Sequence, residues 1–358
     1  MKRYLKILLI IVLLGALGLG FWLFFARQKS NGVNQVQAPE TTNPVLASLN
    51  SFSHILGSLS APVDSPPSGS PSQEKIAPVS GDAADTTSQA SADKFTFAVI
   101  GDTKVFSADN PNGNLQKAVA SIVRSNVNFS FVMGDLIHSC DGGSKCETSF
   151  AEWKSVMQPI LDKTYEVMGN HDRTGGSSAD AVWQKEFNLP TNGPDGFSEL
   201  TYSFDFSNSH FVVLNTEKPK GQVVDSTQRD WLEKDLAANK KENVFVFFHE
   251  PAYQTAQNKN DSLDANPKER DALWAILVKH NVTAVFNGHE HIFSRKKIGN
   301  IYQFVVGDTD STDDDFPQKN LIDYGYKGKS FAVVSVDGKK INMKLYTVDG
   351  NLINSFDF

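Results

Sequence analysis

TAVFNGHEH (residues 283–291) is the stretch around which this chain is organised. Its opening apolar and β-branched residues predict a short buried strand, and the polar residues after them predict a loop at the strand's end. His289 and His291 stand two apart in that loop, as candidate metal ligands. Alone, the pair is weak evidence, because loop histidines are commonly solvated or hydrogen-bonded. The same arrangement recurs four more times along the chain, and that recurrence carries the interpretation.

Four other apolar runs also open into metal-capable residues. The runs at 95–100, 129–133, 165–168 and 244–248 are followed by GDTK (101–104), GDLIH (134–138), GNHD (169–172) and HEP (249–251). Helical patterns separate them, at 115–122, 150–160, 227–239 and 268–280, the last with Leu273, Trp274, Leu277 and Val278 expected to face inward. This alternation predicts an α/β layered sheet, in which ligands bind beyond the carboxyl ends of the strands.

Further strands are predicted on either side of the last helical patterns. Residues 202–206 and 210–215 read as a strand pair. The apolar runs after the histidine pair predict antiparallel strands that complete a second sheet, at 301–306, 331–336, 341–348 and 352–358.

Six residues at the strand ends form a mixed oxygen and nitrogen donor set. Such a set suits Zn, Mn or Fe rather than Ca, and it is large enough for two ions that share a carboxylate. Any one of these residues alone could be a capping aspartate or a turn asparagine. Ligand types at five separate strand ends instead predict a metal centre made of Asp102, Asp135, Asn170, His249, His289 and His291.

Taken in order, the blocks GD, GD, GNHD, HEP and GHEH resemble those of the calcineurin-like metallophosphoesterase superfamily. The resemblance covers roughly residues 95–295. It implies a two-sheet β-sandwich flanked by helices, an α/β (α+β) fold that would occupy residues 94–358. It also implies hydrolysis of phosphate esters by metal-bound hydroxide, with two divalent or trivalent transition metals, Fe, Mn or Zn.

The resemblance also assigns roles to single residues. Asp135 would bridge both metals. The other donors would divide between two sites, Asn170, His249 and His289 in the second and Asp102 and His291 in the first. His171 would protonate the leaving oxygen and be oriented by Asp172. Contacts to the substrate are expected from Asn170, His171 and Arg295.

One position departs from the family's pattern. The first block is usually Asp-x-His, with the histidine on the first metal, but here the third residue is Lys104, whose ammonium has no lone pair. Three arrangements are open. Lys104 turns away, or it stands in the first site as a cation and leaves one metal, or His138 supplies the missing donor. The purple acid phosphatase branch of the superfamily also lacks this histidine and has a ligating tyrosine where His138 stands, and the tail ending in Arg295 is similar to that branch.

Two consequences follow for function. If the first site lacks its metal, the chain is alternatively a catalytically impaired binding or scaffold protein on the same fold, because fold does not guarantee activity. Loss of His289 should then remove the securely held metal, whereas loss of His291 should matter little.

The N-terminus predicts a membrane segment. Lys2, Arg3 and Lys6 precede an apolar run at 7–26, long enough to cross a hydrocarbon core of about 30 Å. Aromatic residues and Arg27 at its exit favour an uncleaved anchor over a signal peptide, with the N-terminus cytoplasmic and the rest outside. The predicted divisions are an anchor at 1–29, a disordered Ser/Pro/Gly-rich linker at 30–93 and the folded domain from 94; secretion after cleavage is the alternative.

The remaining features concern the compartment, the partners and the substrate. Cys140 and Cys146 are predicted to form a disulfide, which an oxidising compartment allows. A net charge of −7 argues against general nucleic-acid binding. The acidic residues Asp308, Asp310 and 313–315 read as a solvated loop, with a Ca site as the alternative. Substrate identity would lie in the loops at 106–114, 173–197 and 253–266, and the sequence sets no oligomeric state.

Overall fold

The computed structural model describes residues 94–104, 113–257, 260–310, 314–316 and 321–358. The predicted anchor (1–29) and linker (30–93) lie outside these residues, as does most of the predicted substrate loop at 106–114. Within the described ranges no helix is both long and apolar enough to cross a membrane.

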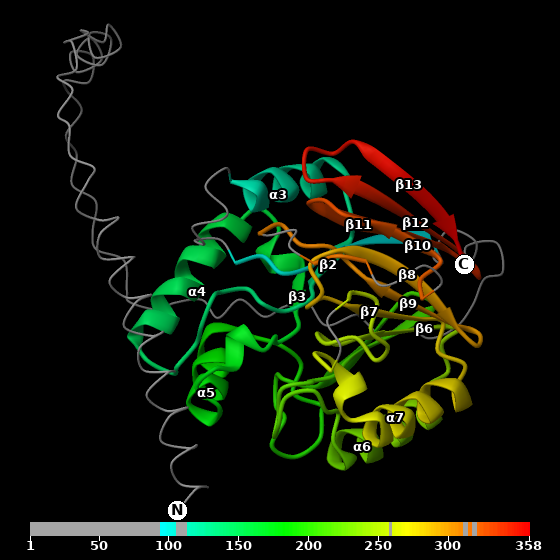
Figure 1. Ribbon diagram of the computed structural model, residues 1–358, viewed down its shortest axis with the longest axis horizontal. Helices are drawn as coiled ribbons and strands as arrows, with labels where there is room; N and C mark the ends of the chain where they lie inside the picture. The colour runs from blue at the N-terminus through cyan, green and yellow to red at the C-terminus, as the bar shows by residue number, and fades with distance from the viewer. Residues whose placement is uncertain (1–93, 105–112, 258–259, 311–313, 317–320) are drawn as a thin grey trace, which may run out of the picture. The chain divides into compact units, whose positions relative to one another are not determined.

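Two mixed sheets form the domain (Figure 1). The first has the order β13 (Leu352–Asp357), β12 (Lys340–Thr347), β11 (Ser330–Asp337), β1 (Lys94–Ile100), β2 (Phe129–Val132) and β3 (Thr164–Glu166). The second has the order β10 (Tyr324–Tyr326), β8 (Phe293–Ile298), β9 (Ile301–Val305), β7 (Ala284–Asn287), β6 (Asn243–Phe247), β5 (Ser209–Val213) and β4 (Tyr202–Phe206).

The helices flank these sheets. Helices α3 (Asn114–Arg124), α4 (Ser144–Met157) and α5 (Ser177–Glu186) lie on the β1–β3 side in Figure 1, and α6 (Ser226–Ala238) and α7 (Pro267–Lys279) lie side by side near β6. Short 3-10 helices are found at Leu161–Lys163, His171–Arg173 and Leu263–Ala265. The two-sheet fold with flanking helices is the predicted one.

An aromatic core fills the space between the sheets. Phe131 of the first sheet stacks on Phe247 of the second with ring centroids 3.7 Å apart, and Phe97 packs edge-on against Phe286 at 6.0 Å. The alternate residues of the second sheet, such as Val246, pack on the other face with α6 and α7. Both faces of β5, β6 and β7 are therefore buried, which explains why their sequences are nearly continuous apolar runs.

The C-terminal strands differ from their predicted arrangement. Strands β11, β12 and β13 extend the first sheet, because β11 pairs antiparallel with β1. Strand β9 does join the second sheet, but it pairs parallel with β7 and antiparallel only with β8. An apolar run indicates a strand without indicating which sheet edge it joins, so the predicted antiparallel completion of the second sheet was wrong for the last three runs.

Smaller differences have local causes. Val278 is 52% exposed although it was expected to face inward, since Leu273, Trp274 and Leu277 already form the buried side of α7. Helix α4 begins earlier than predicted. Helix α5 and the strands β8 and β10 were not predicted, because their sequences are polar and show little periodicity.

His210, at the start of β5, gives the domain a pH-dependent contact. Its Nδ1 lies 2.7 Å from Asp205 Oδ1 and its Nε2 lies 2.8 Å from Asp235 Oδ2. Burial alone would lower the pKa of His210, but the hydrogen bonds to Asp235 and Asp205 outweigh it and raise that pKa. Folding therefore favours the protonated imidazole.

The stabilisation from His210 should accordingly be complete below the unfolded pKa of about 6.5 and be lost as the pH rises through the higher folded value. Thermal unfolding of the wild type and His210→Gln, compared from about pH 5 to about pH 9, should show the wild type's advantage shrinking at high pH. An advantage that does not change with pH would contradict this assignment.

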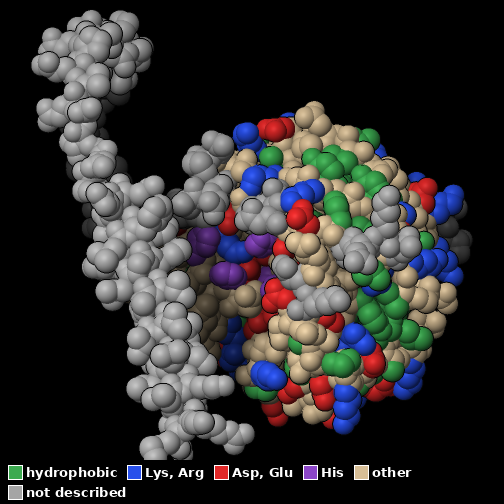
Figure 2. Space-filling model, in the orientation of Figure 1, with side chains coloured by type: hydrophobic (Ala, Val, Ile, Leu, Met, Phe, Trp, Pro, Cys, Tyr) green, Lys and Arg blue, Asp and Glu red, His purple; other side chains and the backbone are tan. Residues whose placement is uncertain are grey.

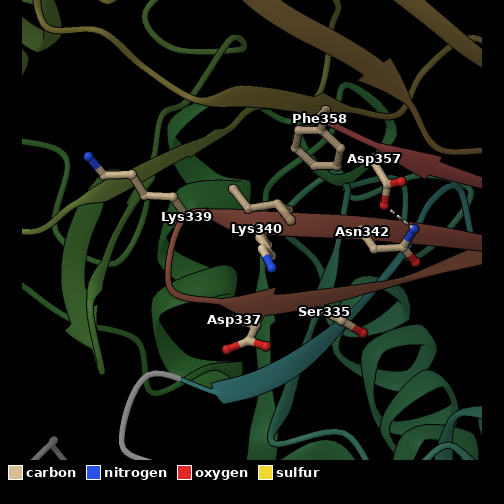
Figure 3. Close-up of a pocket in the computed structure, with 8 residues that line it drawn as sticks. Ser335, Asp337, Lys339, Lys340, Asn342, Asp357 and Phe358 are labelled. Atoms are coloured by element: carbon tan, nitrogen blue, oxygen red, sulfur yellow. Dashed lines mark hydrogen bonds between the residues drawn. The ribbon is translucent and has the colours of Figure 1, made fainter. Parts of the chain in front are cut away.

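A cavity of about 650 Å³ opens at the ends of β11, β12 and β13 (Figure 3). It is lined by residues that include Asp337, Lys340 and Phe358, and in its lining Asn342 of β12 donates a hydrogen bond of 2.8 Å to Asp357 of β13. Asp337 pairs with Lys94, the first residue of β1, whereas the predicted metal ligand Asp102 follows the last residue of that strand. The cavity is therefore separate from the predicted metal centre.

Candidate metal centre

The polar residues after β1, β2, β3, β6 and β7 come together at one end of the sheets. The nearest donor atoms of Asp102, Asp135 and His249 all lie within 4.8 Å of one another. Asn170 Oδ1 lies 3.0 Å from His249 Nε2 and 3.2 Å from His289 Nδ1. In Figure 2 histidine side chains gather in a hollow, with basic and acidic atoms among them. The predicted convergence of five strand ends is thus present.

Three of these residues have an unusual backbone conformation, which sets the direction of their side chains. Asp102, Asp135 and His289 have φ values of 45°, 54° and 70°, in the left-handed region that residues with a Cβ rarely adopt. Such a conformation persists only where the surrounding contacts hold it, and it is characteristic of functional sites. Here Thr103 N donates to Asp135 O at 2.9 Å and His289 N donates to Asp102 Oδ2 at 2.9 Å, which binds these turns to one another.

Two glycines allow the strand ends to approach so closely. A Cβ on Gly169 would lie 2.3 Å from Asp135 Oδ1, and one on Gly288 would lie 2.7 Å from the carbonyl oxygen of Met133. Neither position has room for a side chain. The glycines of the GNHD and GHEH blocks are therefore required by packing around the donors.

Four atoms form the donor group, each within 3.3 Å of the next in the order Asp135 Oδ1, His249 Nε2, Asn170 Oδ1 and His289 Nδ1. His249 Nε2 lies 3.3 Å from the Asp135 oxygen. The outer nitrogens of both imidazoles meet backbone carbonyls, His249 Nδ1 that of Met133 at 2.6 Å and His289 Nε2 that of Asp261. A carbonyl oxygen can only accept, so each outer nitrogen donates its hydrogen there, and in a neutral ring this leaves a lone pair on the inner nitrogen.

This donor group fits a metal ion. Burial lowers the pKa of His249, which favours the neutral imidazole. With neutral rings the four facing atoms are all acceptors with no hydrogen between them, a repulsive arrangement that a cation relieves. The set of one carboxylate, one amide oxygen and two imidazoles suits a transition metal.

Lys104 lies at the other oxygen of Asp135. Its Nζ is 3.0 Å from Asp135 Oδ2, 3.3 Å from His291 Nε2 and 3.9 Å from Asp102 Oδ1, and only 3% of its side chain is exposed. Of the three arrangements open from the sequence, the structure has the one in which the lysine stands inside the first site.

The charges in this group stabilise one another. Burial would lower the pKa of Lys104, but the carboxylates of Asp135 and Asp102 outweigh it and hold that pKa above its usual range. Burial would raise the pKa of Asp135, but His249 and Lys104 hold it below its usual range. Lys104 is therefore an ammonium and Asp135 a carboxylate at neutral pH.

His291 completes the group around Lys104. Burial lowers its pKa, but the hydrogen bond and charge of Asp102 outweigh this and raise the pKa to about 9. A neutral His291 accepts from Lys104, and a protonated one is held instead by Asp102, whose Oδ1 is 3.6 Å from Nε2. In both states the imidazole is occupied by contacts within the protein.

His171 stands beside the donor group with 41% of its side chain exposed. Its Nδ1 lies 2.6 Å from the carbonyl oxygen of His138, and its Nε2 lies 3.8 Å from Asp135 Oδ2. Because a carbonyl can only accept, Nδ1 carries a hydrogen and Nε2 faces the site. The exposed side makes the ring reachable by a ligand in the hollow.

One predicted role differs in the structure. Asp172 does not orient the ring of His171; its Oδ1 accepts from the backbone N–H groups of Leu136 and Ile137 and its Oδ2 from that of Gly169, so it joins the two ligand-bearing turns. The side chain of His138 is exposed, its ring stands edge-on to that of His171 with 6.5 Å between the centroids, and its backbone carbonyl accepts from His171 Nδ1. His138 as a compensating ligand stays a prediction.

The Cys140–Cys146 disulfide is present, as predicted. Cys140 N donates to His171 O at 3.1 Å, and Gly175 N donates to Cys140 O at 2.7 Å. The disulfide therefore fixes the loop whose His138 carbonyl orients His171.

The acidic loop is not solvated as expected. Asp308 and Asp310 are buried, and Asp308 Oδ2 lies 3.9 Å from His291 Nδ1. Asp314 Oδ2 accepts from His291 N at 2.8 Å, while Asp313 lies outside the described residues. Asp315 forms an ion pair of 2.6 Å with Lys327. Of the described acidic residues, Asp308 and Asp314 thus contact His291, whereas the exposed Asp315 pairs with Lys327.

Some residues at the site were missed and one predicted residue lies elsewhere. Glu217 and Glu250 are buried carboxyl groups, and burial together with Glu217's charge raises the pKa of Glu250 to about 10. Glu250 was visible within the HEP block, but nothing in the sequence marked Glu217 or the carbonyl of Asp261. The half-buried Arg295 has its guanidinium over the ring of Phe356 in β13, 4.6 Å from the ring centroid.

Comparison with known proteins agrees with this geometry. A sequence model described as calcineurin-like phosphoesterase matches residues 95–293. Purple acid phosphatase 13 of Arabidopsis thaliana is 28% identical over 177 residues, which cover 47% of this chain and 31% of that protein. Tartrate-resistant acid phosphatase type 5 of Sus scrofa is 28% identical over 197 residues, covering 49% and 56%. This chain thus spans only part of the length of both relatives.

A solved structure shows the same fold. The purple acid phosphatase PPD1 from yellow lupin (Lupinus luteus) seeds superposes with a TM-score of 0.63 at 16% identity, covering 74% of this chain and 53% of that one. The two mixed sheets with their helices are therefore arranged as in that protein.

Proposed function

This chain belongs to the calcineurin-like phosphoesterase family, and from that premise we propose that it hydrolyses phosphate esters with a transition metal ion held at the strand ends. The observation that carries the proposal is the group of four facing acceptor atoms, whose two histidines are oriented by backbone carbonyls. That group has the composition and tautomers of a metal site. We propose that this metal is Fe, Mn or Zn.

Each donor residue has a defined task. Asp135, Asn170, His249 and His289 hold the ion, which when bound supplies Lewis acidity toward a phosphoryl oxygen and lowers the pKa of water. The pKa of Asp135 is held low, so its carboxylate is charged and available as a ligand at neutral pH. Met133 and Asp261 keep the imidazoles in the orientation that ligation requires.

His171 is placed to act on the leaving group. The His138 carbonyl fixes its Nδ1, so Nε2 is the atom that can hold a proton on the side of the site. A protonated Nε2 would give that proton to the departing ester oxygen, which would otherwise leave as an unstable alkoxide. The exposure of the ring allows substrate to reach it.

The proposal is tested on the full chain in detergent, first stripped of metal and then reloaded separately with Mn, Zn or Fe. We expect turnover of a chromogenic phosphomonoester, a chromogenic phosphodiester, or both, only in the reloaded samples. Gly299, in the exposed turn between β8 and β9, offers a matched control substitution, Gly299→Asn, that should leave the metal dependence intact. Bound metal without turnover of either ester would contradict the enzymatic proposal.

That contradicting result would favour a second function. The position of Lys104 inside the first site is the observation behind it, since a chain with a changed metal centre can serve as a binding or scaffold protein on the same fold. Such a protein would bind inorganic phosphate or a phosphate ester without hydrolysing it, and calorimetry would detect this.

We propose that the domain is tethered outside the cytoplasm. The support is the apolar run at 7–26 with its preceding basic residues, and the disulfide, which is characteristic of an oxidising compartment. The full chain should remain with membranes after a carbonate wash, and protease added outside intact cells or spheroplasts should release the domain. Release into the medium without protease would instead indicate a cleaved signal peptide.

A further inference from the structure

We propose that the ammonium group of Lys104 takes the place of the first metal ion, so that this chain binds a single metal ion through Asp135, Asn170, His249 and His289. The inference rests on the proposed function and specifies its metal stoichiometry. The residues of this chain therefore do not fit a centre with two metal ions.

The position of the ammonium is the first observation. Its nitrogen lies among the three residues that would hold a first metal, at 3.0 Å from Asp135, 3.3 Å from His291 and 3.9 Å from Asp102. Asp135 therefore offers one oxygen to each side: Oδ2 to the ammonium and Oδ1 to the donor group at His249. An ion entering the first site would have to occupy the space that Lys104 fills.

The anchoring of Lys104 is the second observation. Its neighbour Thr103 is fixed twice, because its N–H donates to Asp135 O at 2.9 Å and its Oγ1 accepts from Trp153 Nε1 at 2.8 Å. With 3% of its side chain exposed, the lysine would have to leave the carboxylates of Asp102 and Asp135 to make room. Its departure would break both ion pairs, and an entering ion would have to compensate for their loss.

The third observation concerns the charge at the first site and the ligands available there. A fixed ammonium repels a divalent ion placed beside it, and it already neutralises the carboxylates that would attract one. His138, the other candidate donor, has an exposed side chain whose ring stands edge-on to that of His171, with 6.5 Å between the ring centroids. The first site is thus filled by a cation of the chain itself.

The test is a titration of the metal-stripped full chain with Mn²⁺, followed by calorimetry and by electron paramagnetic resonance. The wild type should take up one ion per chain and give the spectrum of an isolated Mn²⁺. Lys104→His should take up two and give the spectrum of a coupled pair, because the substitution removes the cation and adds a donor. Lys104→Met, uncharged and of similar length, should show a second, weaker binding event.

The matched control is Lys117→His, which makes the same substitution at an exposed lysine of α3 paired with Asp349. It should keep the stoichiometry and spectrum of the wild type. Two ions in the wild type would overturn the inference and leave the proposed function standing. No ion in the wild type, with no ester turnover, would overturn both. If the wild type binds one ion and neither Lys104 variant binds a second, Lys104 is not what excludes it, and the inference is also overturned.

Discussion

His289→Ala is expected to remove the bound metal ion and to lower kcat/KM for phosphate esters by at least about 1000-fold. His289 Nδ1 is one of the four donors, and the contact of its outer nitrogen with the Asp261 carbonyl holds the ring in place. Losing a residue that merely orients a ligand costs roughly 10- to 100-fold in metal affinity, and losing the ligand itself should cost more. Metal content after gel filtration and steady-state kinetics would measure both effects.

The matched control is His291→Ala, two residues away in the same block. Its imidazole contacts Lys104 and Asp102 and lies outside the group of four donors. We expect this variant to retain its metal ion at wild-type stoichiometry. Equal loss of metal from the two variants would show that the histidines serve one shared site, contrary to the division described above.

His171→Ala is expected to lower kcat by roughly 100- to 10,000-fold for an alkyl phosphate while metal content stays unchanged. The imidazole has its Nδ1 on the His138 carbonyl and its Nε2 toward the site, and it is not among the four donors. The loss should be much smaller for a nitrophenyl ester, because a nitrophenolate leaves without needing a proton. Rates for the two esters, measured side by side, would give the ratio.

The ratio between the esters is the informative quantity. An equal loss for both would mean that His171 positions the phosphoryl group and does not protonate the leaving oxygen. Asp172→Asn provides a contrast, because Asp172 holds the backbone N–H groups of Leu136, Ile137 and Gly169. That variant should lose thermal stability and should lower both ester rates alike.

The strand ends were predictable because two strong signals coincide there. A buried strand must be apolar, and a metal site needs polar donors, so each boundary between the two is sharp in the sequence, as at Ile100–Asp102 or Phe286–His289. Parallel strands present their carboxyl ends at the same edge, which is why donors distant in sequence could be grouped without a structure.

Other features depend on tertiary contacts that cannot be read from the sequence. The sheet joined by β11 is decided by its pairing with β1, a choice that its apolar pattern leaves open. The role of Asp172 is decided by backbone N–H groups, which every residue possesses. The direction of the Lys104 side chain is decided by charges brought from distant turns, so the sequence left three arrangements where the structure has one.

The donors that would hold the metal come from both sheets, Asp135 and Asn170 from the first and His249 and His289 from the second. An ion would therefore bind the folded domain and not the unfolded chain, because unfolding separates these residues. By mass action, free metal at a hundred times its dissociation constant would add about 2.7 kcal/mol to the free energy of unfolding. A chelator that removes the ion would therefore lower the free energy of unfolding by the same amount.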